Sequence, residues 1–317
     1  MLTRETFIGP WVGLPVAWTK DDKFDEQTYR ADIARMCQFG VPGFYTGGST
    51  GEFFAMEFDE FKAVTRATIE ECKVNGMPVM IGCTSTYTLG VLRRIAYAGE
   101  HGADAIQIAL PYWYEFPEDR LVPFFKQISA AADGLALSLY ETLRTKKVLT
   151  VDEHKMVKDA APNYVMVKSN DGSVGATVDG CIKLAEFLNV FVNEKQWAEL
   201  CPQGACGACS SEVYFNPKVI MQLWQDVRQE NWAAVDACCQ KLAKMGAFLY
   251  ERFGSIGYTD SAYDRLGGAS AGVLQGGLCL RGPYLQPTEQ HVAELRQWYR
   301  DHFPEMLDSG FTDGTEL

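Results

Sequence analysis

The sequence of 317 residues lacks three features that mark other classes of protein. No apolar run approaches the roughly 18 residues that a membrane-spanning helix needs, so a membrane partner is not expected. Lys and Arg number 29 against 41 Asp and Glu, giving a net charge of -12. This balance argues against a nucleic-acid partner, because phosphate binding needs a basic face. Residues 1–13 show no basic segment followed by an apolar one, so no secretory signal is expected.

The chain has too few cysteines for a disulfide scaffold, and it has few histidines. The ten cysteines lie mostly inside apolar segments, as reduced thiols do in the core of a cytoplasmic protein. A small secreted domain held by disulfides would be much shorter and richer in cysteine. The four histidines are scattered, and we assign them no role. The sequence therefore predicts a cytoplasmic protein without a disulfide framework.

The sequence does contain a repeated alternation of short apolar runs with longer amphipathic segments. Hydrophobic residues make up 47% of the chain and aromatic residues 12%, which suffices for a large core. In residues 58–71, for example, Phe61, Val64 and Ile69 fall on one face of a helix. We expect eight strands, at residues 12–17, 43–47, 78–83, 104–110, 135–140, 164–168, 189–193 and 206–210. Eight strand–helix units without an internal break predict a closed (β/α)8 TIM barrel.

Beyond about residue 218 the strand pattern stops and only helical periodicity remains. We expect helices at residues 218–227, 231–251, 260–275 and 287–301. A capping pattern at Pro287-Thr288-Glu289 opens the last of them, and the tail after Pro304 is expected to be frayed. The chain is therefore predicted to have two parts, a catalytic barrel over residues 1–230 and a C-terminal helical domain over residues 231–317.

Lys168 is the most informative residue at the predicted strand ends. In a (β/α)8 barrel the active site lies at the carboxyl ends of the strands. Lys168 directly follows Val165-Met166-Val167, and a lysine that ends a buried strand is unusual. Burial is expected to lower the pKa of the amine and make it a nucleophile toward a carbonyl, with which it forms a Schiff base. The alternative is a lysine whose amine reaches solvent.

Tyr140 ends the preceding predicted strand. Adjacent strands of a barrel lie about 4.8 Å apart, so the phenol of Tyr140 is expected to reach the region of Lys168. A phenol both donates and accepts hydrogen bonds, as a proton relay requires. The alternative is a core tyrosine with its hydroxyl at the rim.

A glycine-rich turn, GGSTGE at residues 47–52, follows the second predicted strand. Its backbone N–H groups and the hydroxyls of Ser49 and Thr50 are suited to hold an anion at a helix N-terminus. The turn is not a P-loop, because no Gly-Lys-Ser/Thr follows, and its glycine spacing is not that of a dinucleotide fingerprint. We therefore expect a small carboxylate there, with a plain capped turn as the alternative.

Together these motifs resemble the dihydrodipicolinate synthase / N-acetylneuraminate lyase family. Tyr140 and Lys168 lie twenty-eight positions apart, and the GGSTGE turn precedes them. Pro111-Tyr112-Trp113 after the fourth strand and residues 280–284 (LRGPY) extend the resemblance over nearly the whole chain. The resemblance implies a (β/α)8 barrel with C-terminal helices, usually in a tetramer. It also implies a Schiff base with pyruvate or another 2-oxo acid, and no metal or organic cofactor.

Several positions depart from the synthases of this family. The synthases carry an arginine five residues after the relay tyrosine, where this chain has Thr145, with Arg144 one place earlier. Trp113, flanked by Tyr112 and Tyr114, stands where the synthases place a tyrosine of the neighbouring subunit. This aromatic mouth resembles that of the hydratase-aldolases of the superfamily that take arylidene-pyruvates. Aspartate semialdehyde is therefore not the expected second substrate.

The strand ends and the resemblance give one set of candidate site residues. By resemblance, Lys168 is the Schiff-base lysine, Tyr140 is the proton relay, and Trp113 is a third catalytic candidate. The expected substrate-binding residues are Gly48, Ser49, Thr50, Tyr112, Tyr114, Arg144, Glu194, Cys209 and Ser211. Among them Ser49 and Thr50 are expected to bind the 2-oxo acid carboxylate. Glu194 and Ser211, with Lys195, stand where the lyases contact the aldehyde part of the substrate.

One motif supports a rival from another class. Cys201-x4-Cys206-x2-Cys209, followed by Cys239, reproduces the spacing of plant-type ferredoxins with a two-iron cluster. Against this, Cys206 and Cys209 fall in the eighth predicted strand, where residues three apart are expected to face opposite sides. A zinc site on the same cysteines has no nearby histidine to complete it.

We therefore predict an enzyme, a Schiff-base-forming lyase or aldolase that acts on pyruvate or another 2-oxo acid. It is expected to cleave or form a C–C bond next to the lysine iminium. A 2-oxo acid dehydratase or hydratase-aldolase that uses the same lysine is the alternative. An iron–sulfur redox protein is a distant one, and a barrel that only binds its ligand is a further one. The expected assembly is a homo-oligomer, either a dimer or a tetramer.

Overall fold

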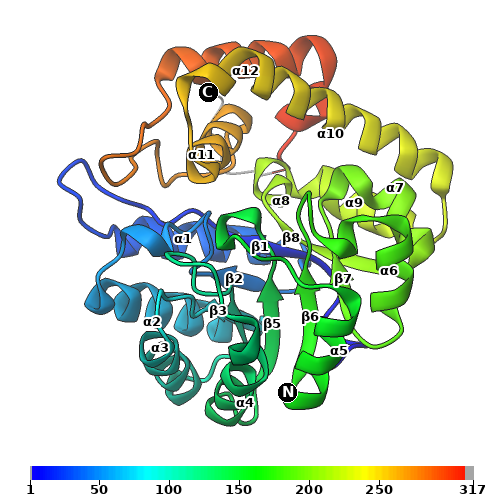
Figure 1. Cartoon of the computed structure of the whole chain (residues 1–317). Coiled ribbons are helices and arrows are strands. Elements are labelled where there is room, and N and C mark those ends of the chain that lie inside the picture. The colour runs from blue at the N-terminus through cyan, green and yellow to red at the C-terminus, as the bar shows by residue number, and fades with distance from the viewer. Residues whose placement is uncertain (1, 311–317) are drawn as a thin grey trace.

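In the computed structural model, which describes residues 2–310, eight parallel strands close into a barrel in chain order (Figure 1). Pairing of the first strand with the eighth completes the barrel. The strands are β1 (Gly9–Gly13), β2 (Phe44–Thr46), β3 (Val79–Gly82), β4 (Ala105–Ile108), β5 (Ala136–Tyr140), β6 (Tyr164–Lys168), β7 (Asn189–Phe191) and β8 (Ala205–Ser210). The predicted (β/α)8 barrel is confirmed.

Helices alternate with the strands on the outside of the barrel and continue beyond β8. They are α1 (Glu26–Cys37), α2 (Phe58–Val74), α3 (Thr88–His101), α4 (Leu121–Ala131), α5 (Val151–Ala160), α6 (Val178–Ala185), α7 (Trp197–Leu200), α8 (Glu212–Phe215), α9 (Pro217–Arg228), α10 (Trp232–Phe253), α11 (Asp260–Ala271) and α12 (Glu289–His302). Within residues 2–310, no helix is both long enough and apolar enough to cross a membrane.

Two predicted elements end earlier in the structure than expected, because a proline or a glycine ends the regular backbone. The first strand was expected at residues 12–17 but spans Gly9–Gly13. Pro15 has no N–H to donate to a strand ladder, which explains why pairing ends before it. The helix expected at residues 260–275 ends at Ala271, because Gly272 takes a left-handed conformation at φ 78°.

The chain beyond α12 remains packed for another turn. Pro304–Leu307 form a 3-10 helix in which Met306 is buried, so the tail is not frayed from Pro304 onward. The rest of the tail for which fraying was predicted, residues 311–317, lies outside the described residues. The division into parts at residues 230 and 231 stays a prediction.

Large side chains fill the inside of the barrel. Trp11, Tyr45, Met80, Met166 and Phe191 form one buried cluster there. A second and larger cluster lies between the strands and the surrounding helices. The barrel is therefore a packed core rather than a channel, as in other (β/α)8 folds.

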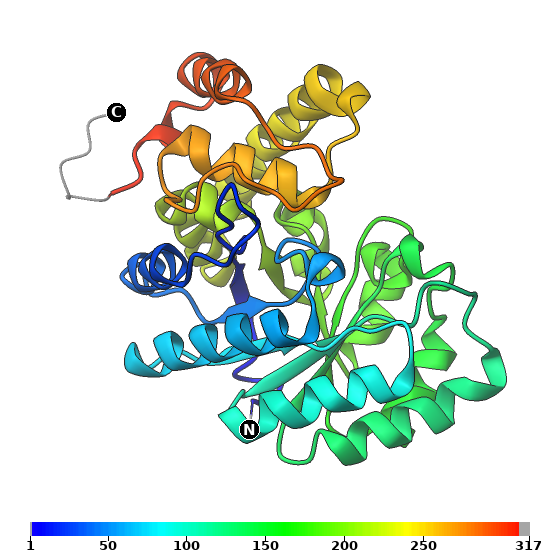
Figure 2. The ribbon, with the colours of Figure 1, turned by 90° about the vertical axis from the view of Figure 1, so that its left-hand side faces the viewer.

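The C-terminal helices lie beyond the carboxyl ends of the strands (Figures 1 and 2). Helix α11 packs against both α8 and α12. Its small residues allow this close approach, since a Cβ added at Gly267 would stand 2.2 Å from the ring of Phe215. The fold thus places one helix of the extension directly over the mouth of the barrel.

A buried ion pair joins this helix to the barrel. Arg265 of α11 pairs with Glu52, in the loop after β2, and their side chains are 1% and 0% exposed. Arg265 also donates to the carbonyl of Val16 at 2.6 Å. Glu52 accepts from the indole N–H of Trp18 and from the backbone N–H of Arg281, both at 3.1 Å. One carboxylate therefore holds together three segments that lie far apart in the sequence.

We expect Glu52→Gln to lower the free energy of unfolding by about 3–5 kcal/mol, because it leaves the buried charge of Arg265 without a partner. Chemical denaturation followed by circular dichroism measures the change. Asp179→Asn is the control, since its pair with Lys183 is exposed (78% at Asp179) and its loss should cost less than about 1 kcal/mol. Equal stability losses in the two variants would contradict the anchoring role of Glu52.

Candidate active site

The strand register places Lys168 beside Tyr140. The two residues are paired across the β5–β6 ladder, as the last residues of their strands. Lys168 Nζ lies 4.3 Å from the centroid of the Tyr140 ring and 5.6 Å from that of the Tyr45 ring. The expectation that the phenol of Tyr140 reaches the region of Lys168 is thus confirmed. The amine stands against the faces of two aromatic rings.

The charge state of Lys168 differs from the expectation. Burial acts to lower the pKa of its ammonium, but Tyr45, Tyr140, Cys209 and Asp260 act to raise it, and the net pKa lies above the ordinary value of lysine. The predicted lowering is therefore wrong. The physical reason is that the electrostatic attraction of these four neighbouring groups outweighs the loss of water around the ammonium. The amine must lose a proton before it can attack a carbonyl.

The phenol oxygen of Tyr140 is held by donors from two neighbouring loops. Asn170 Nδ2 donates to it at 3.0 Å, and the guanidinium of Arg144 is a second hydrogen-bonding neighbour. A phenol that accepts these bonds keeps its own hydrogen available for a ligand. These two donors fix the position of the Tyr140 hydroxyl at the cavity.

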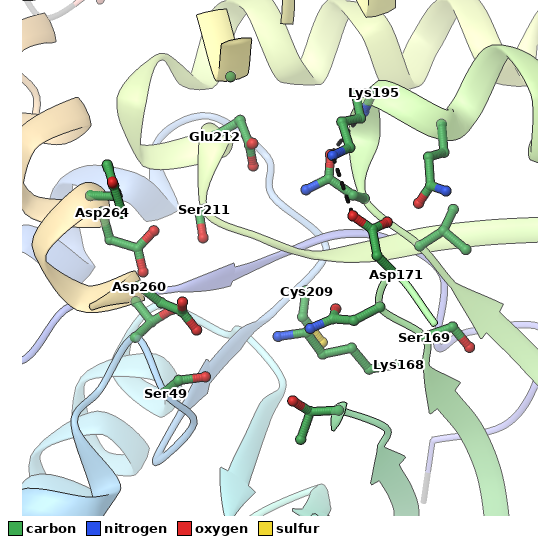
Figure 3. A pocket seen from close by; sticks show the side chains of 18 of the residues that line it. Ser49, Lys168, Ser169, Asp171, Lys195, Cys209, Ser211, Glu212, Asp260 and Asp264 are labelled. Carbon is green, nitrogen blue, oxygen red and sulfur yellow. Dashed lines mark hydrogen bonds and ion pairs between the residues drawn. The ribbon is translucent and has the colours of Figure 1, made fainter. Parts of the chain in front are cut away.

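A cavity of about 520 Å³ opens at the carboxyl ends of the strands, as Figure 3 shows. Its wall combines groups from the barrel and from the C-terminal helices. Seven of the predicted site residues line it: Ser49, Thr50, Tyr140, Arg144, Lys168, Cys209 and Ser211. Lys195 also lines it and pairs with Asp171 at 3.8 Å.

A second cavity of about 400 Å³ shares part of this wall, including Ser49, Tyr140 and Arg144. Its own lining is largely aromatic and comprises Phe53, Phe54, Tyr112, Tyr258 and Tyr284. Arg144 and Asp260 line both cavities and form a two-fold hydrogen-bonded ion pair, with both N–O distances at 2.9 Å. The guanidinium of Arg144 is therefore already neutralised between the two spaces.

Two of the predicted aromatic residues lie away from Lys168. Trp113 and Tyr114 are 70% and 80% exposed. They line a separate cavity of about 370 Å³, together with Phe116 and Phe124, outside the wall that surrounds Lys168. Within one chain, Trp113 and Tyr114 therefore do not join the candidate site, because the loop after β4 turns them outward. Of the four aromatic residues in this loop, Tyr112 alone lines the second cavity, which Tyr140 also lines.

Gly48 and Glu194 also do not line the cavity with Lys168. A Cβ at Gly48 would stand 3.0 Å from the ring of Tyr45, so the absence of a side chain makes room for that ring. Glu194 is 1% exposed, and burial with the nearby carboxyl of Glu212 raises its pKa well above the usual range. The expectation that Glu194 contacts substrate is not supported, because its side chain is buried and does not line the cavity.

The cysteines with ferredoxin-like spacing do not form a metal site. Cys206 and Cys209 both pack against the core inside the barrel, so the expectation that they face opposite sides of β8 is wrong. A register shift between Val190 and Phe191 in the β7–β8 ladder accounts for this. Among residues 2–310, no three His, Cys, Asp or Glu side chains are placed to hold a metal ion. The geometry gives the iron–sulfur alternative no support.

Sequence reasoning missed the acidic groups that the C-terminal helices bring to the cavity. Asp260 and Asp264 of α11 and Glu212 of α8 all line it. They follow Lys168 by more than forty positions, and no strand periodicity marks them. The one available signal was Asp264-Arg265 within a helix rich in Gly and Ala, since charges in such a closely packed helix are buried and need partners.

The chain is similar to proteins of known families over most of its length. It is 33% identical over 225 residues to a probable 5-dehydro-4-deoxyglucarate dehydratase of Rhodococcus opacus, covering 69% of this chain and 71% of that protein. It is 23% identical to a 4-hydroxy-tetrahydrodipicolinate synthase of Campylobacter jejuni, covering 93% and 97%. Among solved structures it is similar to YagE of E. coli K12 in complex with pyruvate, with a TM-score of 0.82, 23% identity, and coverage of 93% and 98%. Residues 7–298 match the dihydrodipicolinate synthetase family, and the chain therefore belongs to that family.

Proposed function

We propose that Lys168 attacks the ketone of pyruvate or another 2-oxo acid and forms a Schiff base, while Tyr140 moves the protons. The observation that carries this proposal is the pairing of Tyr140 with Lys168 at the end of β5 and β6, with the amine 4.3 Å from the phenol ring. The resulting iminium acts as an electron sink, so the adjacent C–C bond breaks or forms through an enamine.

Family membership confirms the predicted class of enzyme, a lyase of the class I aldolase type that acts on 2-oxo acids. The chemistry is carried by side chains of the barrel, and neither a metal nor an organic cofactor takes part in the proposed cycle. Ser49 and Thr50 are proposed to hold the carboxylate of the 2-oxo acid, because both line the cavity opposite the lysine strand.

The two connected cavities support an apolar second substrate. Arg144 is paired with Asp260, so a second carboxylate would have to compete with Asp260 for its guanidinium. The neighbouring cavity offers the rings of Phe53, Phe54 and Tyr112 instead. An aromatic aldehyde fits this surface better than aspartate semialdehyde does, since the latter carries both an ammonium and a carboxylate.

Dehydration of a hydroxylated 2-oxo acid is a second candidate function. The dehydratase relative at 33% identity favours it. Dehydration uses the same first half of the cycle, because the enamine that forms next to the lysine can also expel a hydroxyl group as water. Lys168 and Tyr140 therefore keep their roles in either outcome.

We also propose that the protein is a cytoplasmic homo-oligomer, a dimer or a tetramer. The residues Tyr87, Leu89, Trp113 and Tyr114 are all large, apolar and more than half exposed in the single chain. Exposed aromatic clusters of this kind mark protein interfaces. Trp113 and Tyr114 would then be interface residues, buried against a second copy of the chain.

Light scattering should show more than one chain per particle. Trp113→Ser should reduce the number of chains per particle, because it removes a large apolar side chain from the proposed interface. A monomeric wild-type protein would contradict the proposal.

Incubation with pyruvate and borohydride should add one irreversible adduct per chain, on Lys168. Intact mass and peptide mapping measure it. Lys168→Arg should abolish the adduct and leave the fold intact, because Arg keeps the charge but is not a usable nucleophile. Lys195→Arg is the matched control, since Lys195 lines the same cavity and should not be needed for the adduct. An adduct that maps to another lysine would overturn the assignment.

Tyr140→Phe should slow the exchange of the pyruvate methyl protons with D2O, followed by NMR, by about 10²–10⁴-fold. Its free energy of unfolding should change by at most about 1–2 kcal/mol, because only a hydroxyl is lost. Tyr164→Phe provides the contrast. Tyr164 is also buried and its hydroxyl lies 3.0 Å from His154 Nδ1, outside the cavity, so this variant should lose some stability and keep exchange. Near-normal exchange in Tyr140→Phe would remove Tyr140 from the mechanism.

A further inference from the structure

Asp264 is a buried carboxyl group at the wall of the main cavity without a complete set of partners. It projects from α11 toward the cavity, near Ser211 (Figure 3). The residue is 6% exposed, and its Oδ2 has no hydrogen-bond partner within residues 2–310. Buried polar atoms are nearly always paired, so this oxygen calls for an explanation. A partner that enters the cavity from outside would supply one.

The surroundings of Asp264 favour its neutral form near pH 7. Burial raises the pKa of its carboxyl to about 7, the hydroxyls of Thr50 and Ser211 act to lower it, and the carboxylates of Asp260 and Glu212 act to raise it. Asp264 therefore changes its charge within the working range of most enzymes.

The other titratable groups that face Asp264 come from three elements. They are Tyr45 of β2, Glu212 and Tyr214 of α8, and Asp260 of its own helix. Burial raises the pKa of both phenols far above neutrality, so neither ionises with Asp264. Asp260 is ion-paired with Arg144, and Glu212 faces the buried Glu194. The groups that act most strongly on the Asp264 carboxyl include no cation.

The protonation state of Asp264 controls which way the Thr50 hydroxyl points. A hydroxyl has one hydrogen to donate, and an ionised carboxylate can only accept. When Asp264 is ionised, Thr50 must donate to it, and its hydrogen is turned away from the cavity. When Asp264 is protonated, it can donate to Thr50 Oγ1, which leaves the Thr50 hydrogen free for an anion in the cavity. Protonated Asp264 has one hydrogen, so while it donates to Thr50 the hydroxyl of Ser211 still donates to the carboxyl.

We propose that Asp264 is a proton-controlled positioning residue for the 2-oxo acid carboxylate. In its neutral form it orients the Thr50 hydroxyl as a donor toward the bound carboxylate. In its ionised form it withdraws that donor and repels the carboxylate. The inference rests on the proposed function, because it assumes that the carboxylate binds at Ser49 and Thr50.

Carboxylate binding is then linked to the protonation of Asp264. Affinity for the 2-oxo acid is full below pH 7, where Asp264 is neutral, and falls as the pH rises above it, by up to about tenfold per pH unit. The titration of Lys168 does not change how the equilibrium affinity for the 2-oxo acid depends on pH. Its ammonium and the protonated iminium carry the same charge, so its deprotonation affects the rate of formation rather than the final occupancy.

The test is the pyruvate concentration that gives half-maximal adduct at equilibrium, trapped by borohydride and read by intact mass between pH 5.5 and 9. The wild-type value should be constant below pH 7 and should rise about tenfold or more by pH 9. In Asp264→Asn the half-maximal pyruvate concentration should stay, from pH 5.5 to 9, at the value that the wild type shows at pH 6. The reason is that the amide is neutral at every pH and still donates to Thr50. Asp171→Asn, which removes an exposed acid at the same cavity, should keep the wild-type rise.

The same measurement on Thr50→Val tests the inference independently, even if Asp264→Asn does not fold. Loss of the hydroxyl should raise the half-maximal concentration at pH 6 by about tenfold and narrow the difference between pH 6 and pH 9. A pH-independent wild type, an Asp264→Asn variant that keeps the rise, or a Thr50→Val variant that keeps the full difference would each overturn the inference. Absence of any adduct in the wild type would instead contradict the proposed function, and this inference with it.

Discussion

The hydrogen-bonded register between β5 and β6 is the constraint on which the candidate site depends. It pairs Tyr140 with Lys168 at the last position of each strand, where the barrel opens. A slip of one residue would turn either side chain to the other face of the sheet, because side chains alternate along a strand. The register also brings the amine against the rings of Tyr45 and Tyr140, which explains why it rests as a cation. The β5–β6 register therefore determines both the position of Lys168 and the charge state of its amine.

The loop after β2 links this constraint to the C-terminal helices. Ser49 and Thr50 turn toward the cavity, while Glu52, two residues on, is buried against Arg265 of α11. The same ion pair therefore fixes both the hydroxyls at the cavity and the helix that supplies Asp264. A barrel without the extension would keep Lys168 and Tyr140 but would lose one wall of the site. The C-terminal helices therefore form part of the wall of the candidate site.

Sequence periodicity predicted the parts of the site that lie on strands and missed those that depend on tertiary packing. The positions of Lys168 and Tyr140 at the strand ends could be predicted because a polar residue after an apolar run is visible in the sequence, and the pairing of β5 with β6 brings the two side chains together. Asp264 was missed because its importance comes from a helix that returns to the barrel mouth from far along the chain. Glu194 was placed in the cavity, since sequence gives its position but not the direction in which the turn after β7 points it. The raised pKa of Lys168 depends on ring contacts that only the folded barrel creates.

The central claim is that Lys168 and the loop after β2 bind one 2-oxo acid between them. A crystal structure of the protein soaked with pyruvate tests this most directly, because it locates the covalent bond and the carboxylate in one measurement. The account predicts continuous electron density from Lys168 Nζ to the second carbon of pyruvate, with the carboxylate within hydrogen-bond distance of Ser49 and Thr50. Pyruvate bound without a bond to Lys168, or with its carboxylate on Arg144 in place of Asp260, would contradict it.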